Sequence, residues 1–249
     1  MILRRSFLAL PLAALATPAK DSFRFVHFTD IHIQSELRAA EYTARCMEAI
    51  NATQADFAIA GGDLVFDANL VGRPRATELV ALYQRITSKL RMPVSSVIGN
   101  HDLFGIGDRG KTGSQLAQQA RRDWESEFGP RTRAFSHNGW QVITLDSIDV
   151  LPGGGYRGWI GPDERSWLRT VLARADQGTP VIVVTHIPLV TAFLQYGDLR
   201  NSNPDNALVV ENAREVVDLL LKHNVKAVLQ GHTHICERVE YKGCQFVTT

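Results

Sequence analysis

The sequence predicts an α/β domain with a buried, mixed sheet. Short apolar runs alternate with stretches of helical periodicity, the apolar runs carry few polar residues on either face, and 45% of the 249 residues are hydrophobic. Strands that are apolar on both faces are typical of a sheet covered by helices. A chain of this length supports one large domain with a substantial core and is too short for two comfortable ones.

Six apolar runs are predicted strands, at 23–29, 56–60, 94–98, 140–145, 181–185 and 225–230. Apolar residues recur at helical spacing in four other stretches, at 79–90, 116–124, 168–172 and 209–220. Asn138-Gly139 is typical of a hairpin turn, which makes the predicted sheet system mixed rather than purely parallel.

Five of the six predicted strands are followed, directly or after one or two glycines, by polar residues of the types that bind metal ions. These residues are Asp30 and His32, Asp63, Asn100 with His101 and Asp102, His186, and His232 with His234. In open α/β sheets, ligands bind at the carboxyl ends of the strands. We therefore expect one shared site at this edge of the sheet.

Seven of these residues are candidate metal ligands: Asp30, His32, Asp63, Asn100, His186, His232 and His234. Carboxylate and imidazole without thiolate suit Mn, Fe, Zn or Co rather than a structural zinc site built on cysteines. Seven groups are too many for one ion and about right for two, with Asp63 as the natural bridging carboxylate.

The sequence also predicts the backbone conformation at the strand ends, in two respects. Residues two apart on an extended strand tip point the same way, so Asp30 with His32, and His232 with His234, can each reach one cation. The neighbouring glycines are expected to let the chain turn sharply away from the sheet; they are Gly61, Gly62, Gly99 and Gly231.

The motif order DxH, GGD, GNHD, a lone His and GHTH resembles the calcineurin-like metallophosphoesterase superfamily, over residues 25–235. This resemblance implies a four-layer α/β/β/α sandwich and two transition-metal ions. It implies that one ion is held by Asp30, His32, Asp63 and His234. The other ion would be held by Asp63, Asn100, His186 and His232.

The same resemblance implies a hydrolytic mechanism in which a hydroxide bridging the two ions attacks phosphorus. His101 resembles the histidine of the family that protonates the leaving oxygen as a general acid. Asp102 is expected either to orient the His101 ring or to cap the turn, and the sequence leaves both open.

The GNHD-type site resembles the cyclic-nucleotide-phosphodiesterase-like branch, which makes phosphodiesters the first expected substrate class. Phosphomonoesters and pyrophosphate bonds remain open. The run GDLVF (62–66) lacks the tyrosine ligand expected in purple acid phosphatases, which argues against that branch.

Two other functions are less favoured by the sequence. A nuclease would need a basic groove, whereas the formal net charge is only +1, so nucleic acid is not an expected partner. A non-catalytic scaffold on the same fold would be expected to have lost ligands, and every ligand position is filled. A small phosphoester is therefore the expected partner.

Residues 1–19 are expected to form a secretory signal that is removed from the domain at 20–249. Arg4-Arg5 precedes an apolar run too short to span a bilayer, and RRSFL resembles a twin-arginine signal, with an ordinary Sec signal as the alternative. This predicts recognition by an export machinery, a periplasmic or secreted location, and no transmembrane segment in the mature chain. The end in FVTT, a predicted strand without a closing turn, leaves open a domain that lacks its last strands.

Several other residues are candidates for supporting roles near the site. Asp146 lies at the same sheet edge, as either a ligand orienter or a turn cap. Loop 151–161 is expected to be a surface loop in which Tyr156 and Arg157 could touch substrate, although solvation is favoured. Arg109 and Lys111 could meet a phosphate. A hairpin turning at Lys242-Gly243 would keep Cys236 and Cys244 out of disulfide register.

Overall fold

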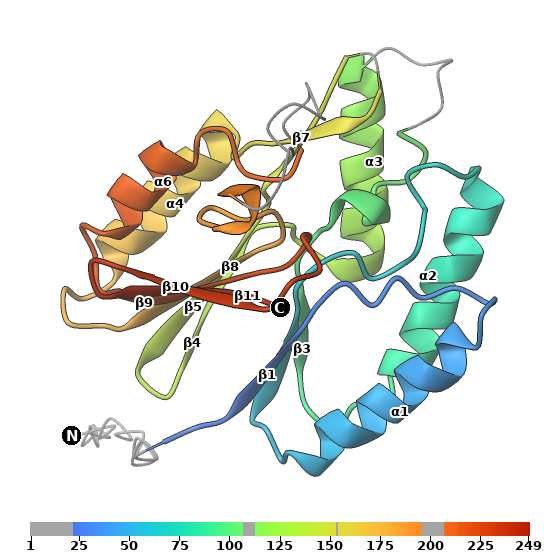
Figure 1. Ribbon diagram of the computed structural model, residues 1–249, viewed down its shortest axis with the longest axis horizontal. Coiled ribbons are helices and arrows are strands. Elements are labelled where there is room, and N and C mark those ends of the chain that lie inside the picture. Colours follow the sequence, from blue (N-terminus) through green and yellow to red (C-terminus); the bar gives the residue numbers. More distant parts are fainter. Residues whose placement is uncertain (1–21, 107–112, 153, 196–206) are drawn as a thin grey trace, which may run out of the picture.

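Two sheets lie between two sets of helices in the computed structural model, which describes residues 22–106, 113–152, 154–195 and 207–249 (Figure 1). The expected signal at 1–19, and Arg109 and Lys111, lie outside the described residues.

The smaller sheet holds the first three predicted strands in sequence order. It consists of β1 (Phe25–Phe28), β2 (Phe57–Ala60) and β3 (Val94–Ser96). All three strands are parallel, so their carboxyl ends lie at one edge. The prediction that this edge carries the residues after each strand is confirmed for this sheet.

The larger sheet has six strands in the order β10-β11-β9-β8-β5-β4. Their bounds are β4 (Arg133–His137), β5 (Trp140–Leu145), β8 (Val181–Thr185), β9 (Val225–Gln230), β10 (Glu237–Tyr241) and β11 (Cys244–Thr248). The four central strands are parallel, and β4 and β10 are antiparallel at the two edges. The mixed sheet is therefore confirmed, and Asn138 (φ 51°) and Gly139 (φ 81°) form the expected hairpin turn.

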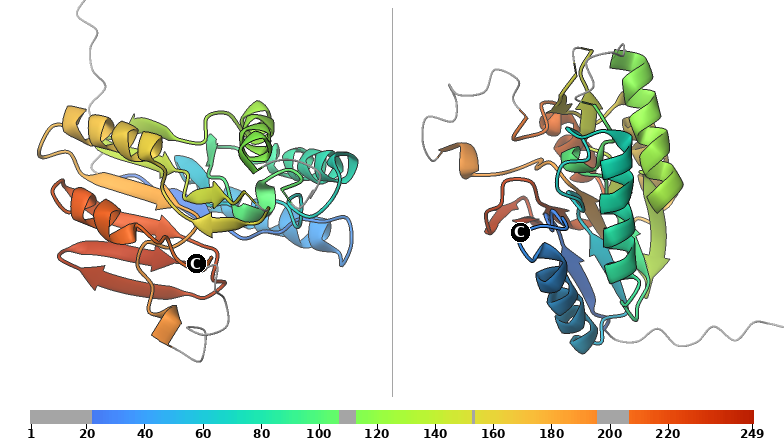
Figure 2. Two further views of the ribbon diagram at one scale, coloured as in Figure 1. Left: turned by 90° about the horizontal axis from the view of Figure 1, so that it is seen from above. Right: turned by 90° about the vertical axis from the view of Figure 1, so that its right-hand side faces the viewer.

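Helices cover the outer faces of the two sheets, as Figures 1 and 2 show. The helices are α1 (Ala39–Ala52), α2 (Arg73–Thr87), α3 (Gly113–Phe128), α4 (Pro162–Arg174) and α6 (Ala213–Leu220). Pro162 in the first turn and Asp163 and Glu164 beside it favour the start of α4, because proline needs no amide partner there and acidic groups stabilise a helix N-terminus.

Three hydrophobic clusters define the four layers. One joins α1 and α2 to the outer face of the smaller sheet through residues such as Met47, Leu79 and Ala58. A second fills the space between the sheets, and a third joins α3, α4 and α6 to the larger sheet. Successive residues of a strand point to opposite faces of the sheet. In β8, Ile182 therefore lies in the cluster between the sheets, and Val183 lies in the cluster between the larger sheet and its helices.

Three elements differ from the sequence prediction. Helix α1 was not predicted, although Thr43, Met47 and Ile50 recur at helical spacing on its buried face. The predicted helix at 209–220 begins only at Ala213, since Val210 forms a bridge with Gly158. Within loop 151–161, β7 (Tyr156–Gly158) pairs with β6 (Ile148–Val150) as an antiparallel ribbon.

The structure also bears on the sequence predictions for the cysteines and for membrane-spanning helices. Tyr241 pairs with Cys244 in the β10–β11 hairpin, as the turn at Lys242-Gly243 predicts, and Cys46, Cys236 and Cys244 are free. Among the described residues, no helix has the length and apolar character needed to cross a bilayer.

Candidate metal centre

The ends of β1, β2, β3, β8 and β9 bring all seven candidate ligands to one place. The loops are fastened together by backbone hydrogen bonds: the Asp30 amide donates to the Gly62 carbonyl at 3.0 Å, and the His32 amide donates to the Asp63 carbonyl at 3.0 Å. Asn100 lies in a short 3-10 turn, Asn100–Asp102, that follows β3. The expectation of one shared site is therefore met in the geometry, while the role of each residue as a ligand stays a prediction.

The first group consists of Asp30, His32 and His234. The Nε2 atoms of His32 and His234 lie 3.1 Å apart, and His234 Nε2 lies 3.2 Å from Asp30 Oδ1. The Thr29 hydroxyl donates to Asp30 Oδ2 at 2.7 Å, which fixes the carboxylate. Three ligand atoms therefore converge on one point.

The second group consists of Asp63, His186 and His232. His186 Nδ1 donates to the Gly61 carbonyl at 3.0 Å, and His232 Nε2 donates to the Ala207 carbonyl at 2.8 Å. A histidine that uses one ring N–H in this way presents its other nitrogen as a lone pair, which is how metal-binding histidines are usually oriented.

Asp63 lies between the two groups. Its Oδ2 atom is 3.2 Å from His186 Nε2 and 3.6 Å from His32 Nε2, while its Oδ1 accepts the His101 amide at 2.8 Å. Asp63 is 1% exposed, so this carboxylate is held in a single buried position. The geometry agrees with the bridging position that the sequence predicts for it.

The side chains present fit two transition-metal ions. Two ligand atoms that each lie ~2.1 Å from a shared ion, in roughly perpendicular directions, are ~3 Å apart. The distances within the first group are 3.1, 3.2 and 3.8 Å, and Asp63 Oδ2 lies 3.2 Å from His186 Nε2 in the second. Asn100 Oδ1 is buried without a hydrogen-bond partner, and the Asp63 carboxylate, 3.2 Å away, is the only polar contact recorded for His186 Nε2 among the described residues. A buried polar atom without a partner is costly. Metal coordination would satisfy both atoms.

Charges in the centre are strongly coupled. Burial disfavours the charged form of His186, but the adjacent Asp63 carboxylate outweighs burial and raises the pKa of His186 to about 9. Burial would raise the pKa of Asp63, yet the neighbouring histidines, His186 first, bring it well below its usual range. Burial and then the charge of His186 lower the pKa of His232 to about 4. Metal binding at neutral pH is therefore expected to release a proton from His186.

The ligand residues themselves carry the sharp turns of the backbone. Positive φ angles occur at Asp30 (54°), His32 (46°), Asp63 (49°), His232 (72°) and His234 (53°). The expected extended tips are therefore wrong, because these residues lie in the left-handed region. The pairing within GHTH is also wrong, since His234 lies in the first group and His232 in the second.

The glycines serve mainly to allow close approach. Gly62 has a φ of 104°, but Gly99 has a φ of −106° that any residue can adopt. A Cβ at Gly99 would lie 2.0 Å from the Asp63 amide nitrogen and 2.2 Å from its Oδ1. The expectation of a sharp turn at every glycine is thus wrong, and Gly99 is required because Asp63 lies against it.

Replacing Gly99 by alanine is expected to displace Asp63 and to lower metal affinity by roughly 10- to 100-fold, the usual effect of disturbing the support of a ligand. The measurement is a calorimetric titration with Mn²⁺. Gly178→Ala is the matched control, because a Cβ at Gly178 meets nothing within 4 Å. Unchanged affinity in Gly99→Ala would contradict the close-packing role.

Asp102 is a clamp for the backbone. Its Oδ1 accepts the amides of Leu64 (2.8 Å) and Val65 (3.1 Å), and its Oδ2 accepts the Gly99 amide at 2.8 Å. Among the described hydrogen bonds of Asp102, none goes to the His101 ring. Of the two roles left open by the sequence, the geometry favours the turn cap, which here also joins the Asp63 loop to the Asn100 turn.

His101 lies beside the first group. Its ring centroid is 4.6 Å from that of His32 at an interplanar angle of 84°, and 6.3 Å from that of Phe66. Burial lowers the pKa of His101, and the Asp63 carboxylate opposes that effect. His101 also forms a possible donor set with His32 and Asp63. Its ring is therefore close enough to act on a group bound at the centre.

Other candidates from the sequence divide into near and distant residues. Tyr156 places its ring edge-on to His232, with centroids 6.2 Å apart, so it borders the centre. Arg157 instead pairs with Asp149 and Glu211. Asp146 accepts the Ile148 amide and pairs with Arg131, so it serves the β6 turn.

The sequence indicates no role for Phe66 beyond the missing tyrosine hydroxyl in the run GDLVF (62–66). The Phe66 ring centroid lies 6.3 Å from those of both His32 and His101. A lone phenylalanine in a loop carries no chemical signal, and only its place after Asp63 could have drawn attention to it.

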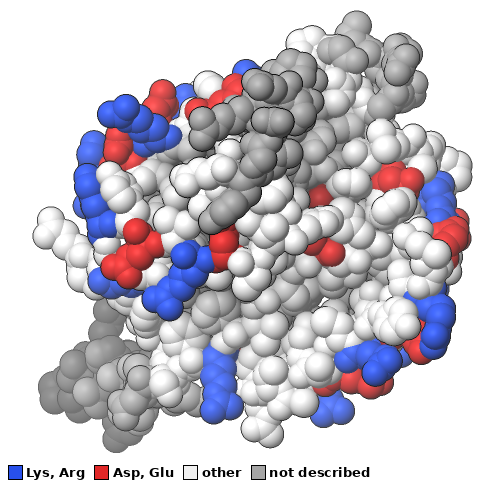
Figure 3. Space-filling view, viewed as in Figure 1, with Lys and Arg blue, Asp and Glu red and all other residues white. Residues whose placement is uncertain are grey.

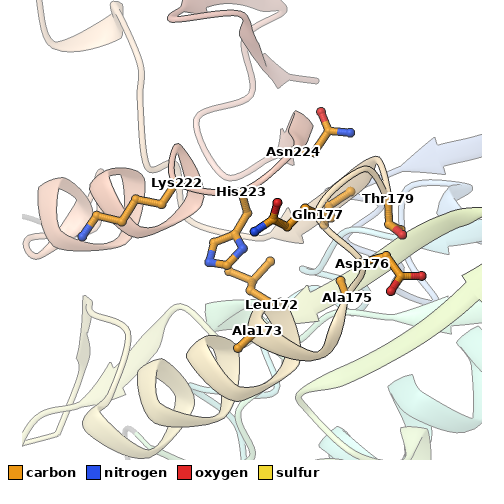
Figure 4. A pocket seen from close by; sticks show the side chains of 10 residues that line it. Leu172, Ala173, Ala175, Asp176, Gln177, Thr179, Lys222, His223 and Asn224 are labelled. Carbon is orange, nitrogen blue, oxygen red and sulfur yellow. The ribbon is translucent and has the colours of Figure 1, made fainter.

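A cavity of about 670 Å³ lies at the opposite edge of the larger sheet, where β8 and β9 begin (Figure 4). Its lining includes Leu172, Asp176, Thr179, Lys222 and His223. None of the candidate ligands lines it, so it is separate from the centre.

The family profile for calcineurin-like phosphoesterases matches residues 23–236. The chain belongs to the calcineurin-like phosphoesterase family. This finding confirms the resemblance noted in the motifs, and it places the chain among metal-dependent phosphoric ester hydrolases.

This phosphoesterase is similar in sequence to two curated proteins. The 3′,5′-cyclic adenosine monophosphate phosphodiesterase CpdA of Haemophilus influenzae is 25% identical over 92% of this chain and 76% of the relative. A probable cyclic nucleotide phosphodiesterase of Xenorhabdus bovienii is 23% identical over 74% of this chain. That match spans 63% of the Xenorhabdus protein, which is just under two thirds of its length.

Solved structures share the fold of this phosphoesterase. A dimetal phosphatase from Danio rerio superimposes with a TM-score of 0.65 at 15% identity, over 93% of this chain and 87% of that one. A purple acid phosphatase from yellow lupin superimposes with a TM-score of 0.61 at 16% identity, over 93% of this chain and 44% of that one. These likenesses confirm the metallophosphoesterase fold predicted from the resemblance.

Proposed function

We propose that this phosphoesterase hydrolyses phosphodiesters at a dinuclear metal centre. The observation that carries the proposal is the position of Asp63, whose Oδ2 atom lies 3.2 Å from His186 Nε2 and 3.6 Å from His32 Nε2. Asp30, His32, Asp63 and His234 would hold one ion. Asp63, Asn100, His186 and His232 would hold the other.

Two bound transition-metal ions supply an activated water near neutral pH and neutralise charge on the phosphoryl oxygens. The residues of the chain make this centre rigid before substrate arrives. The carbonyls of Gly61 and Ala207 fix the two histidines of the second group, and Thr29 fixes Asp30. Preorganised groups of this kind need little rearrangement during the reaction.

His101 would deliver a proton from its imidazole to the leaving ester oxygen. The His101→Ala variant is therefore expected to lose roughly 10²- to 10⁴-fold in kcat for an ester with an alkoxide leaving group, such as a 3′,5′-cyclic nucleotide. The loss should be under about tenfold for bis-p-nitrophenyl phosphate, because p-nitrophenolate leaves without protonation. Equal losses on both substrates would contradict the role of general acid.

The preference for diesters rests on the two sequence relatives, one a 3′,5′-cyclic adenosine monophosphate phosphodiesterase and the other a probable cyclic nucleotide phosphodiesterase. The test is hydrolysis of bis-p-nitrophenyl phosphate and of p-nitrophenyl phosphate by the Mn²⁺-loaded protein. A higher kcat/KM for the diester supports the proposal. Activity on the monoester alone would replace it by a phosphomonoesterase, and activity on pyrophosphate bonds alone by a pyrophosphatase.

The described part of the face drawn in Figure 3 shows no continuous row of basic side chains that would support a nuclease. Most of its basic side chains lie toward the two sides of the view, beside acidic ones. Long nucleic acids bind through rows of lysine and arginine that neutralise phosphates. A small phosphodiester fits the described part of this face better than a polynucleotide.

A further inference from the structure

Phe66 is an exposed aromatic residue on a rigid segment. Its side chain is 40% exposed. The Phe66 amide donates to the Ile33 carbonyl at 3.1 Å, and the preceding residue, Val65, donates to Asp102 at 3.1 Å. Val65 itself is 1% exposed and forms a bridge with Ile33. The backbone is therefore fixed at Phe66 itself and at the residue before it.

Phe66 differs in its ring contacts from the other large hydrophobic residues that are exposed in the described part of the chain. Those residues are Leu37, Tyr42, Leu70 and Tyr241. The described ring contacts of Tyr42 and Tyr241 are with arginine or lysine, whereas those of Phe66 are with His32 and His101. Single exposed hydrophobic residues are common, so this contact is what gives Phe66 a candidate function.

The orientation of the ring indicates which part of a substrate it would meet. The Phe66 and His101 rings are inclined by 33°, with centroids 6.3 Å apart, so a group that binds against His101 lies within reach of the Phe66 ring. The group that reaches His101 in the proposed reaction is the leaving group.

We infer that Phe66 is a specificity residue that binds the leaving group of the substrate, and that it favours phosphodiesters whose leaving group is planar and apolar. This inference rests on the proposed function. An apolar ring held on a fixed backbone loses little conformational freedom when it is covered. Stacking of an aromatic group on it contributes about 1–3 kcal/mol, by analogy with bases on aromatic side chains.

The kinetic test uses bis-p-nitrophenyl phosphate and methyl p-nitrophenyl phosphate, which share a leaving group and differ in the other ester group. In Phe66→Ala, KM is expected to rise by roughly 5- to 50-fold on both substrates, with kcat changed less than about threefold, since binding alone is lost. Phe66→Leu should show an intermediate rise. Tyr241→Ala is the matched control, because it removes an exposed aromatic side chain from the distant end of β10.

A binding test separates this inference from the proposed function. Calorimetry with the Mn²⁺-loaded protein compares phenylphosphonate with methylphosphonate, which present the same phosphonate group. The wild type should bind the phenyl compound more tightly, and Phe66→Ala should lose most of that preference. A wild type that hydrolyses neither diester but keeps this preference would overturn the proposed reaction and support an aromatic site at Phe66.

Two results would overturn the inference. One is a KM in Phe66→Ala within about twofold of the wild type on both diesters, together with an unchanged phosphonate preference. The other is a rise confined to bis-p-nitrophenyl phosphate, which would place Phe66 against the ester group that stays on phosphorus.

Discussion

Replacing Asp63 by alanine is expected to lower kcat/KM on bis-p-nitrophenyl phosphate by about 10³-fold or more. The carboxylate lies between both ligand groups, so its loss weakens both sites and removes several kcal/mol of transition-state stabilisation. Metal analysis of the purified variant should give at most one tightly bound ion per chain. The wild type should hold two.

The control for this variant is Asp176→Ala, which removes an exposed carboxylate at the opposite edge of the sheet. It should keep both ions and full activity. If Asp63→Ala kept two ions with unchanged affinity, Asp63 would not bridge them. If it kept activity, the dinuclear mechanism would be wrong.

Replacing Asp102 by alanine is expected to destabilise the metal-free protein by about 3–5 kcal/mol, because each buried amide left without an acceptor costs about 1–3 kcal/mol. Three amides, of Gly99, Leu64 and Val65, lose their acceptor. Burial and the charge of Asp63 raise the pKa of Asp102 to about 7, so removing a carboxyl that is costly to ionise offsets part of this loss. Urea unfolding of both proteins gives the difference in free energy.

Asp102→Asn is the matched variant, because its amide oxygen can still accept from Leu64 and Val65 while its NH₂ group faces the Gly99 amide. We expect a cost of about 1–2 kcal/mol, near that of one lost hydrogen bond. The ratio of activities on alkoxide and p-nitrophenolate leaving groups should stay at the wild-type value. A ratio that shifted as in His101→Ala would show that Asp102 orients His101 after all.

The sequence was sufficient to predict the edge of the sheet at which the centre lies. Buried strands are recognisable from their apolar runs; His186 follows such a run directly, and Asp63 follows one after two glycines. Parallel strands then bring their ends together, so proximity follows from topology. The same reasoning failed for His232 and His234, because it assumed extended backbone where the chain is left-handed.

Other features depend on tertiary contacts that the sequence does not show. Asp102 is equally suited to a turn and to a catalytic site, and only its three amide partners distinguish these roles. Helix α1 is stabilised by packing of Met47 and Ile50 on the smaller sheet, and the sequence of the helix alone does not show that contact. The glycine-rich sequence around β7 favours a loop, and β7 forms a strand only because it pairs with Ile148–Val150 of β6.

The left-handed backbone of the ligands limits how this centre can change, in evolution or by design. Five ligand positions have positive φ, a conformation in which aspartate, asparagine and histidine are enriched several-fold over other side chains. Glutamate or cysteine would bind many of the same metals, but at these positions each would add backbone strain to any gain in coordination. The residues tolerated at these positions must therefore both coordinate the ion and adopt a positive φ angle. Exchanges between aspartate, asparagine and histidine are the ones that satisfy both restrictions.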